Sequence, residues 1–349
     1  VAAAWGGAWT ASREVALALP EAFAAWLRYA IVIPLLFAWL IWKEGGAAPK
    51  DSQGGSETPV ETTGKGERYL GVGRKRLQIP DRGTLRDLAL MGLFATTLYQ
   101  LLYMHGMERT AAGDASVIIT FNPAFTALLA IPFLGRRMTR KLAVGLLLGL
   151  AGVAIVTGWS PNNDIPFNDR LTGDILIMCA AGVWAASTNL MKRILEREDA
   201  PGRYHPTPLA IMAWTALLGW LMLTPFALWD LYTHANAAFP DTAGWLWIAY
   251  LAVISTVLAY VWFAQGVDEI GATGAATYVY LVPVFGILSG WLILDESLGF
   301  SLLVGLGLVL AGVRLAQQES IEEGARPEAT AEDVQSEVTA EAIEGRHST

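Results

Sequence analysis

The sequence predicts an all-α integral membrane protein with ten transmembrane helices in two inverted five-helix repeats. Hydrophobic residues make up 54% of the 349 residues and charged residues only 16%, a composition typical of a chain that lies largely in lipid. Two apolar stretches, 112–153 and 271–313, also repeat one order of features: a Pro-centred segment, a short polar turn and a segment with spaced glycines. Together these observations indicate a duplicated membrane unit.

The duplication can be followed residue by residue. Pro123 aligns with Pro283, and the same offset aligns Phe125 with Phe285, Leu134 with Leu294, Gly145 with Gly305, and Gly152 with Gly312. Paired segments interrupted by Pro are typical of secondary transporters, so the pattern favours a substrate site between the two halves.

Ten segments approach the length of about 20 apolar residues that is needed to cross the hydrocarbon of a bilayer. They are 1–18, 22–43, 84–107, 111–134, 139–158, 172–194, 207–229, 243–266, 272–294 and 299–317. The first begins at Val1 without a Met, and we expect residues that would complete this span to be missing before it.

Lys and Arg in the connections predict how the chain is oriented. The connections after the second, fourth and sixth spans are rich in both, whereas the opposite connections offer only Arg109 and Arg170. The positive-inside rule therefore places the even-numbered connections and both termini in the cytoplasm, in a multi-pass protein of the plasma membrane. Because each half has an odd number of spans, the repeat must be inverted.

The chain divides into a first repeat over 1–158, a second repeat over 172–317 and an acidic tail over 318–349. The first repeat carries an insert, 44–82, that is rich in Gly, Ser, Thr, Glu and Lys. Such a composition cannot bury enough apolar surface to offset chain entropy, so we expect the insert and the tail to be disordered and cytoplasmic.

Three charged residues lie inside the first two spans, where charge is costly unless it is paired or faces water. We expect Arg13, Glu14 and Arg28 to gather near the extracytoplasmic mouth as a gate or ion-pair group. The alternative is a paired set that only fixes the hairpin of these two spans.

Pro is expected to shape the fourth and ninth spans. At Asn122-Pro123 and at Pro283 the ring removes a backbone hydrogen bond, which should bend each helix and free a carbonyl near the middle of the membrane. Free carbonyls are tolerated where they line a cavity. Helix packing without any ligand is the competing interpretation.

Aromatic side chains predict the wall of a pocket. Trp5 and Trp9 share one helical face, as do Tyr99 and Tyr103. The other members of this predicted pocket are Trp184, Tyr260 and Tyr280, with Gln100, Asn122, Asn189 and Gln265 as polar tips. Such a pocket suits a mostly apolar or zwitterionic molecule. An interfacial belt is the alternative, above all for Trp245 and Trp247.

The remaining polar and small residues have simpler expected roles. Spaced glycines allow helices to approach closely. Carboxylates at predicted helix ends, Asp114 and Glu296 among them, are expected to be solvated or to cap helices. A proton-coupling role for Asp114 or Glu14 is the alternative.

The sequence offers no basis for catalysis or for a cofactor. It contains neither His-Glu-x-x-His nor Gly-x-Ser-x-Gly, and its four histidines are scattered. We therefore expect no enzyme activity, no catalytic residue, no metal site and no cofactor. Nothing in the composition favours nucleic acid as a partner.

The most specific motifs are Trp5-Gly6 with Arg13, Arg28, Asn122-Pro123, Leu134-Gly135, Gly145, Gly152, Trp184-Ala185, Pro283, Leu294-Asp295-Glu296-Ser297-Leu298, Gly305 and Gly312. With these motifs the chain resembles the EamA-domain transporters of the drug/metabolite transporter superfamily, over nearly everything except 44–82 and the tail. The resemblance implies ten helices, a cavity between the repeats and movement of small metabolites or xenobiotics, often outward. One departure is Arg136, which stands where the second repeat has Glu296; a carboxylate there would cap the following helix.

The sequence as a whole thus predicts a secondary transporter that exports small metabolites, amino-acid-like compounds or drugs by alternating access. Its expected partners are a small-molecule substrate and the lipid bilayer, and a homo-oligomer is left open. The alternatives are a channel or facilitator, a membrane scaffold and, less favoured, an intramembrane enzyme.

Overall fold

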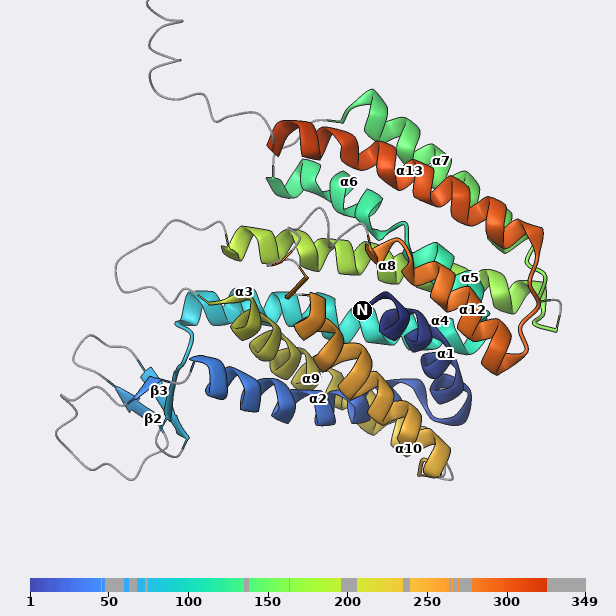
Figure 1. Ribbon diagram of the computed structural model, residues 1–349. Helices are drawn as coiled ribbons and strands as arrows, with labels where there is room; N and C mark the ends of the chain where they lie inside the picture. The colour runs from blue at the N-terminus through green and yellow to red at the C-terminus, as the bar shows by residue number, and fades with distance from the viewer. Residues whose placement is uncertain are drawn as a thin grey trace, which may run out of the picture.

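The computed structural model describes residues 1–44, 46–47, 60–62, 68–72, 75–134, 138–162, 164–195, 206–234, 239–263, 265–266, 269 and 278–324. This part of the chain is a bundle of long helices with a small sheet at one end (Figure 1). Eight helical segments are long and apolar enough to cross a membrane. The protein is therefore an all-α integral membrane protein, as the sequence predicted.

Each of the ten segments that were expected to span the membrane contains at least one described helix, although some helices extend beyond the expected bounds. Those of the first half are α1 (Ala2–Ala18), α2 (Glu21–Glu44), α3 (Arg82–Gly92), η1 (Leu93–Leu98), α4 (Tyr99–Arg109), α5 (Ala112–Ile119), α6 (Asn122–Leu134) and α7 (Arg140–Gly158). Those of the second half are α8 (Phe167–Leu195), α9 (Pro208–Thr233), α10 (Thr242–Ala249), η2 (Tyr250–Leu258), α12 (Val282–Leu294) and α13 (Phe300–Gly324).

Side-chain caps fix where several of these helices begin. The N-cap residues Asp81, Thr139, Thr207 and Asp241 each accept a backbone N–H from the first turn of α3, α7, α9 and α10, respectively. Asp and Thr suit this position because a short side-chain oxygen satisfies an N–H that the helix leaves unpaired. The polar residue before each apolar run therefore sets the start of the helix.

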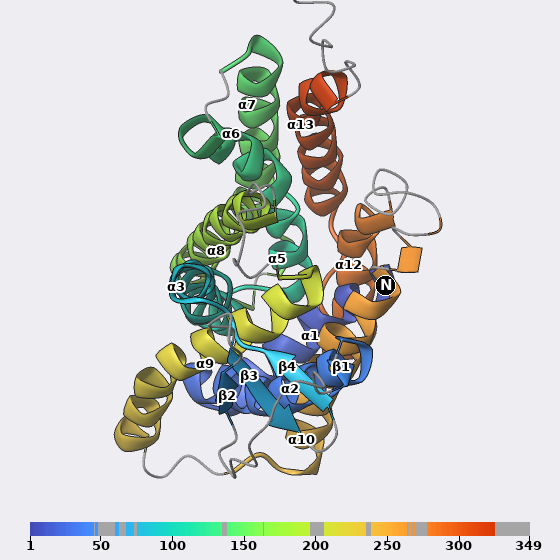
Figure 2. The ribbon, with the colours of Figure 1, turned by 90° about the vertical axis from the view of Figure 1, so that its left-hand side faces the viewer.

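The helices form a bundle in which distant segments lie side by side. Packed pairs include α7 with α13, α2 with α9, α1 with α12, and α6 with α8. The α6, α7 and α13 group lies on one side of the bundle and the α2, α9 and α10 group on the other, with α1, α5, α8 and α12 between them (Figures 1 and 2). Both halves of the chain thus contribute to each side.

Glycines bring α7 and α13 into backbone contact. A Cβ atom added at Gly145 would lie 2.5 Å from the carbonyl oxygen of Gly312, and one at Gly312 would lie 2.5 Å from that of Gly145. Gly152 and Gly305 face each other in the same way, at 2.7 Å and 2.9 Å. These distances leave no room for any side chain, so the expectation that the glycines serve close packing is confirmed.

The Pro residues interrupt their helices instead of bending them. Turns at 120–121 and 280–281 end one helical stretch, and Pro123 and Pro283 lie in the first turn of α6 and α12. In the first turn of a helix the missing N–H of Pro costs nothing. The predicted mid-helix bend is therefore replaced by a break, at matching places in the two halves.

A second matched feature is a π-helical stretch in each half. Both η1 and η2 lie within long membrane-crossing segments, Arg82–Arg109 and Thr242–Phe263. Each contains a pair of hydroxyl residues, Thr96 and Thr97 in η1 and Ser255 and Thr256 in η2. Stretches of this kind are rare and recur at functional sites.

Part of the insert that was expected to be disordered is described as strands, while 48–59, 63–67 and 73–74 lie outside the described residues. The strands β1 (Gly46–Ala47), β2 (Val60–Thr62), β3 (Arg68–Val72) and β4 (Lys75–Gln78) form an antiparallel sheet in the order β1-β4-β3-β2. Strands can satisfy their backbone groups through cross-strand hydrogen bonds, which average composition does not reveal. The tail differs too, because α13 continues to Gly324; 325–349 lie outside the described residues.

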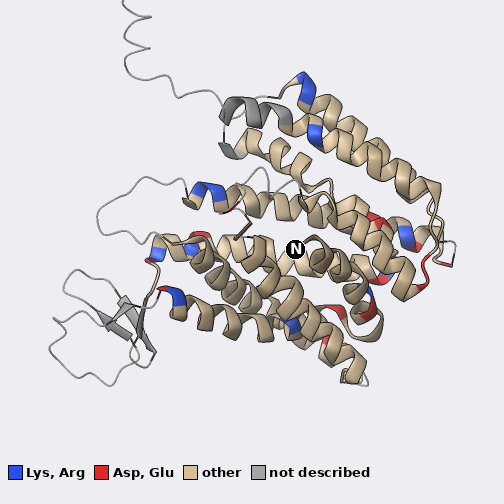
Figure 3. Ribbon diagram, in the orientation of Figure 1, with Lys and Arg blue, Asp and Glu red and all other residues tan. Residues whose placement is uncertain are grey.

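Charge is distributed unequally between the two ends of the bundle. Lys and Arg gather at the end where α2 stops and α3 begins. Asp and Glu gather at the opposite end, around the C-terminal ends of α1 and α12 (Figure 3). The end of α2 carries Lys43, the start of α3 carries Arg82, and the last turn of α8 carries Lys192 and Arg193. We call the two ends of the bundle the basic end and the acidic end.

Candidate functional site

Six of the predicted pocket residues form one aromatic cluster, which we define as Trp5, Trp9, Tyr99, Tyr103, Trp184 and Tyr260. Ring centroids of Tyr99 lie 5.0 Å from Trp184 and 5.4 Å from Tyr103, which in turn lies 5.3 Å from Trp9. Trp5 lies 5.7 Å from Tyr260. Helices α1, α4 and α8 and the α-helical residues that follow η2 supply these rings, so both halves of the chain build the cluster.

Several polar atoms beside this cluster have no hydrogen-bond partner within the described part of the chain. Arg28 donates from Nη2 to Thr256 Oγ1 at 2.8 Å, but its Nε has no partner. The indole nitrogen of Trp9 and the Oε1 atom of Gln100 are likewise buried and unpaired. Since buried polar groups are normally satisfied, these unpaired atoms distinguish the surroundings of the cluster from an ordinary apolar core.

The position of Arg28 corrects the expectation that it joins Arg13 and Glu14. The guanidinium of Arg28 lies 6.0 Å from the ring centre of Tyr29 and donates a hydrogen bond to Thr256 in η2. The charges that act on Arg13 instead come from Glu296, Asp164, Asp114 and Glu14. Arg28 lies seven residues beyond Glu21, about two turns into α2. That depth places it with the aromatic cluster and not at the acidic end.

Asn122, Pro123 and Asn189 lie apart from the aromatic cluster, between α6 and α8. The amide nitrogen of Asn189 donates to the carbonyl oxygens of Thr126 (3.1 Å) and Ala185 (3.0 Å). Thr126 in turn donates to the carbonyl oxygen of Asn122 at 3.1 Å. Because both N–H groups of Asn189 are used, its amide holds these helices together.

Tyr280 and Pro283 lie beside α13 and α5. The hydroxyl of Tyr280 donates to Oε1 of Gln317 in α13. The hydroxyl of Ser116 in α5 reaches the carbonyl oxygen of Pro283 at 3.4 Å. The structure therefore separates the predicted site residues into the aromatic cluster and two groups at helix contacts.

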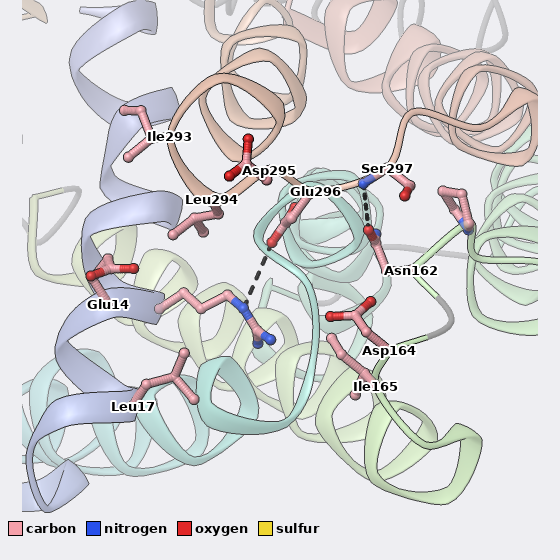
Figure 4. Close-up of a pocket in the computed structure, with 12 residues that line it drawn as sticks. Glu14, Leu17, Asn162, Asp164, Ile165, Ile293, Leu294, Asp295, Glu296 and Ser297 are labelled. Atoms are coloured by element: carbon pink, nitrogen blue, oxygen red, sulfur yellow. Dashed lines mark hydrogen bonds and ion pairs between the residues drawn. The ribbon is translucent and has the colours of Figure 1, made fainter.

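At the acidic end, Arg13 and Glu296 close the bundle in an arrangement that we call the latch. Arg13 Nη1 donates to the carbonyl oxygens of Met107, at 3.0 Å, and Thr110. Glu296 accepts the N–H groups of Ala112 at 2.6 Å and Gly113 at 2.9 Å. The two side chains face each other, with Nε 3.7 Å from Oε1, as the dashed line in Figure 4 marks.

The latch joins the two halves of the chain. The motif predicted that a carboxylate at this position would cap the following helix, which is α13. Instead Glu296, which follows α12, caps the N-terminus of α5. A carboxylate at this position satisfies two orphan N–H groups and opposes the positive end of the helix dipole. Burial raises the pKa of Glu296 above its ordinary value, while the N–H groups of Gly113 and Ala112 and the charge of Arg13 oppose the rise.

A cavity of about 660 Å³ adjoins the latch. Arg13, Glu14 and Leu17 of α1 line it together with the connections after α7 and α12 (Figure 4). Asn162 ties those two connections together, because its Oδ1 accepts the N–H of Ser297 at 2.8 Å. Arg13 and Glu14 therefore both line this cavity.

A second charged group lies close to the latch, and sequence reasoning did not predict it as a group. Asp114 is 0% exposed and Asp174 only 2%, although Asp114 was expected to be solvated or to cap a helix. Arg170, 5% exposed, lies one helical turn before Asp174 on α8. The spacing of Arg170 and Asp174, four residues apart in an apolar helix, is the one signal that could have drawn attention to them.

A membrane bundle whose buried aromatic cluster keeps polar atoms free has the architecture of a small-molecule transporter. The chain belongs to the EamA-like transporter family, whose family model matches residues 69–158 and 171–317. The resemblance drawn from the motifs is thus confirmed. The protein is a membrane transporter, with a small molecule as substrate and the bilayer as its surroundings.

Individual relatives agree with this family. A protein of Archaeoglobus fulgidus named an uncharacterized transporter is 30% identical over 293 residues, which cover 83% of this chain and 86% of that one. A protein of Streptantibioticus cattleyicolor named a probable terminal-alkyne amino-acid exporter is 27% identical over 75% of this chain and 80% of its own. One crystal structure shares the fold, with a TM-score of 0.54, 15% identity and coverage of 92% and 95%.

Proposed function

We propose that the protein is a secondary transporter of the plasma membrane that exports small amino-acid-like compounds, metabolites or drugs by alternating access. Residues 1–158 and 172–317 form two inverted five-span halves, and the substrate binds between them at the aromatic cluster. The single observation that carries this proposal is the cluster itself, because both halves build it and unpaired polar atoms lie beside it.

The pattern of helix contacts supports the two-fold relation. If the halves exchange, α7 exchanges with α13 and α2 with α9, so each of these packed pairs maps onto itself. The same exchange turns the α1–α12 pair into the α8–α6 pair, which is also packed. Self-matching contacts of this kind are expected of two copies related by a two-fold axis.

The glycine contacts and the helix breaks support the same relation. The sequence alignment pairs Gly145 with Gly305 and Gly152 with Gly312, so the exchange converts the Gly145–Gly312 contact into the Gly305–Gly152 contact. The breaks before Pro123 and Pro283 and the π-helical stretches η1 and η2 also occur in matching spans. We therefore count α1 and α12 as spans, which brings the total to ten.

Charge supports the orientation. Membrane proteins keep Lys and Arg on the cytoplasmic side, so the basic end faces the cytoplasm and the acidic end faces outward. The latch then closes the extracytoplasmic end of the pathway, while α1 and α12, which carry it, belong to different halves. Alternating access requires such a contact to break when the outer side opens.

The substrate class follows from the cluster and from one relative. Aromatic rings offer apolar contact, and the Arg28 guanidinium beside them has a free Nε that can meet a carboxylate. The Streptantibioticus relative is named for an amino-acid product. An amino-acid-like molecule matches both observations.

Counterflow in liposomes tests the proposal. Liposomes containing the purified protein are loaded with a mixture of the twenty amino acids, and uptake of each labelled amino acid is followed. We expect saturable uptake that depends on the internal load. Uptake that does not depend on the internal load would indicate a channel. If amino acids, metabolites and cationic dyes are all not taken up, the proposed transport site is overturned.

Trp5→Ala and Trp184→Ala should lower the rate of this counterflow at limiting substrate about tenfold, because each removes an aromatic contact from the cluster. A tenfold change corresponds to about 1.4 kcal/mol, within the range for one lost aromatic partner together with its buried surface. Trp245→Ala is the matched control, since Trp245 is 42% exposed near the start of α10. Equal losses in all three variants would reduce the cluster to a structural role.

A further inference from the structure

The acidic end contains two buried carboxyl groups that the latch does not use. Asp114, on α5, and Asp174, on α8, are 0% and 2% exposed. Asp174 accepts a hydrogen bond on Oδ1 from the Thr110 hydroxyl, but its Oδ2 has no partner among the residues that the structure describes. Within the same part of the chain neither oxygen of Asp114 has a hydrogen-bond partner, and the hydroxyl of Ser160 lies near it without reaching hydrogen-bond geometry.

The cation whose charge acts on both carboxyls makes its hydrogen bonds to backbone carbonyl oxygens instead of to the carboxyls. Arg170 donates to the carbonyl oxygens of Asn162 at 3.0 Å and Thr157 at 3.3 Å, and its Nε is unpaired. An isolated buried carboxylate costs several kcal/mol, far more than the helix N-terminus at α5 returns. Asp114 in this geometry is therefore a neutral, protonated carboxylic acid.

The charges on the neighbouring elements do not alter this balance. Arg13 and Glu14 come from α1, Asp295 and Glu296 follow α12, Asp164 and Asp169 flank the start of α8, and Glu108 and Arg109 end α4. The Arg13 charge is committed to Glu296 and the Arg109 charge to Glu108. Among the described residues, Arg170 alone remains to offset Asp114 and Asp174, and it can neutralise only one of them.

We propose that Asp114 and Asp174 form a proton-binding site, in which one proton is held beside Arg170 and must be bound for the latch to close. The site deepens the transport function proposed above, on which its role in gating rests, and it makes the proton a second ligand of the protein. Binding the proton forms one carboxyl O–H bond and removes one negative charge; releasing it restores the charge.

The contacts connect this site to the latch directly. Thr110 donates its hydroxyl to Asp174 and offers its carbonyl oxygen to Arg13. Asp114 follows Gly113, whose N–H binds Glu296. A second unneutralised charge on the carboxyl pair therefore repels Glu296 across the first turn of α5 and favours separation of α5 from α12. Loss of the proton opens the outer end, and uptake of the proton closes it.

Infrared difference spectroscopy of the purified full chain tests the proton site without any substrate. Across a titration from acid to alkaline pH, we expect the carbonyl band of a protonated buried carboxylic acid to disappear. The band should be lost in Asp114→Asn or Asp174→Asn and retained in Asp169→Asn, an exposed carboxylate one residue from Arg170. The Glu296→Gln variant shows whether the Glu296 carboxyl group contributes to the band, because it removes that carboxyl group. A spectrum unchanged in both the Asp114 and the Asp174 variants would overturn the proposal.

Thiol accessibility tests the link to the latch. With Cys179 replaced by Ser, the substitution Ser116→Cys puts a thiol on α5 against α12, where Ser116 is 0% exposed. We expect labelling from outside to rise about tenfold or more from acid to alkaline pH, and Asp114→Asn, which mimics the protonated acid, to keep it low. If labelling ignores pH while the infrared band titrates, the site binds a proton but does not gate. Absence of counterflow, by contrast, would overturn only the transport function.

Discussion

The Glu296→Gln variant should open the outer end of the protein. Two backbone N–H groups each meet one carboxylate oxygen of Glu296, and the Gln amide can accept only one of them, so its NH₂ group faces the other; the substitution also leaves Arg13 without its counter-charge. Breaking a buried charged pair from one side costs about 3–5 kcal/mol. We therefore expect labelling of Ser116→Cys, in a background with Cys179 replaced by Ser, to rise at least about tenfold, and net transport to fall.

The neighbouring carboxylate supplies the control. Asp295 is exposed and lies in the left-handed region at φ 54°, a conformation that Asn tolerates well. Asp295→Asn removes the same charge one residue away and should leave labelling unchanged. Arg13→Gln should behave as Glu296→Gln does. If both latch variants label at the rate of the parent, the latch does not hold the outer end closed.

The second large effect is expected at the glycine contact between α7 and α13. Gly312→Ala forces a Cβ to within 2.5 Å of the Gly145 carbonyl oxygen and 2.7 Å of the Gly149 nitrogen, both backbone atoms that cannot turn away. Overpacking of this kind costs about 1–3 kcal/mol. We expect the apparent melting temperature in detergent to fall by about 5 °C or more, with a smaller monodisperse fraction on gel filtration.

Gly307, on the same helix, provides the comparison. A Cβ atom at this position has no neighbour within 4 Å, and Ala is a better helix former than Gly. Gly307→Ala should therefore match or exceed the parent in melting temperature. If the two variants melt alike, the helices can separate enough to accept a methyl group, and the contact is looser than its geometry implies.

Much of the fold could be predicted because membrane spans depend on local sequence. Apolar length and flanking polar caps such as Thr139 and Thr207 act within a few residues, and the helices begin where these signals occur. The glycine pattern was also readable, since only small residues permit backbone contact. The strands of the insert were missed because their pairing is set by register, which composition does not carry.

The site was harder to predict because its decisive contacts join residues far apart in the chain. Glu296 caps a helix 183 residues earlier at Gly113, so its local motif indicated the wrong helix. Arg28 was grouped with Arg13 by nearness in sequence, while its depth in α2 brings it to the rings. Asp174 attracted no notice, since its burial depends on how α8 meets α4 and α5.

The glycine contact also has a mechanical meaning. Two helices that touch through their backbones at both Gly145–Gly312 and Gly152–Gly305 have no intervening side chains whose rotamers could change to permit sliding. In the alternating access proposed above, we therefore expect the α7–α13 pair to stay fixed in register while the rest of each half moves relative to it. The larger movement is then expected in α1 and α12, which do not belong to this fixed pair.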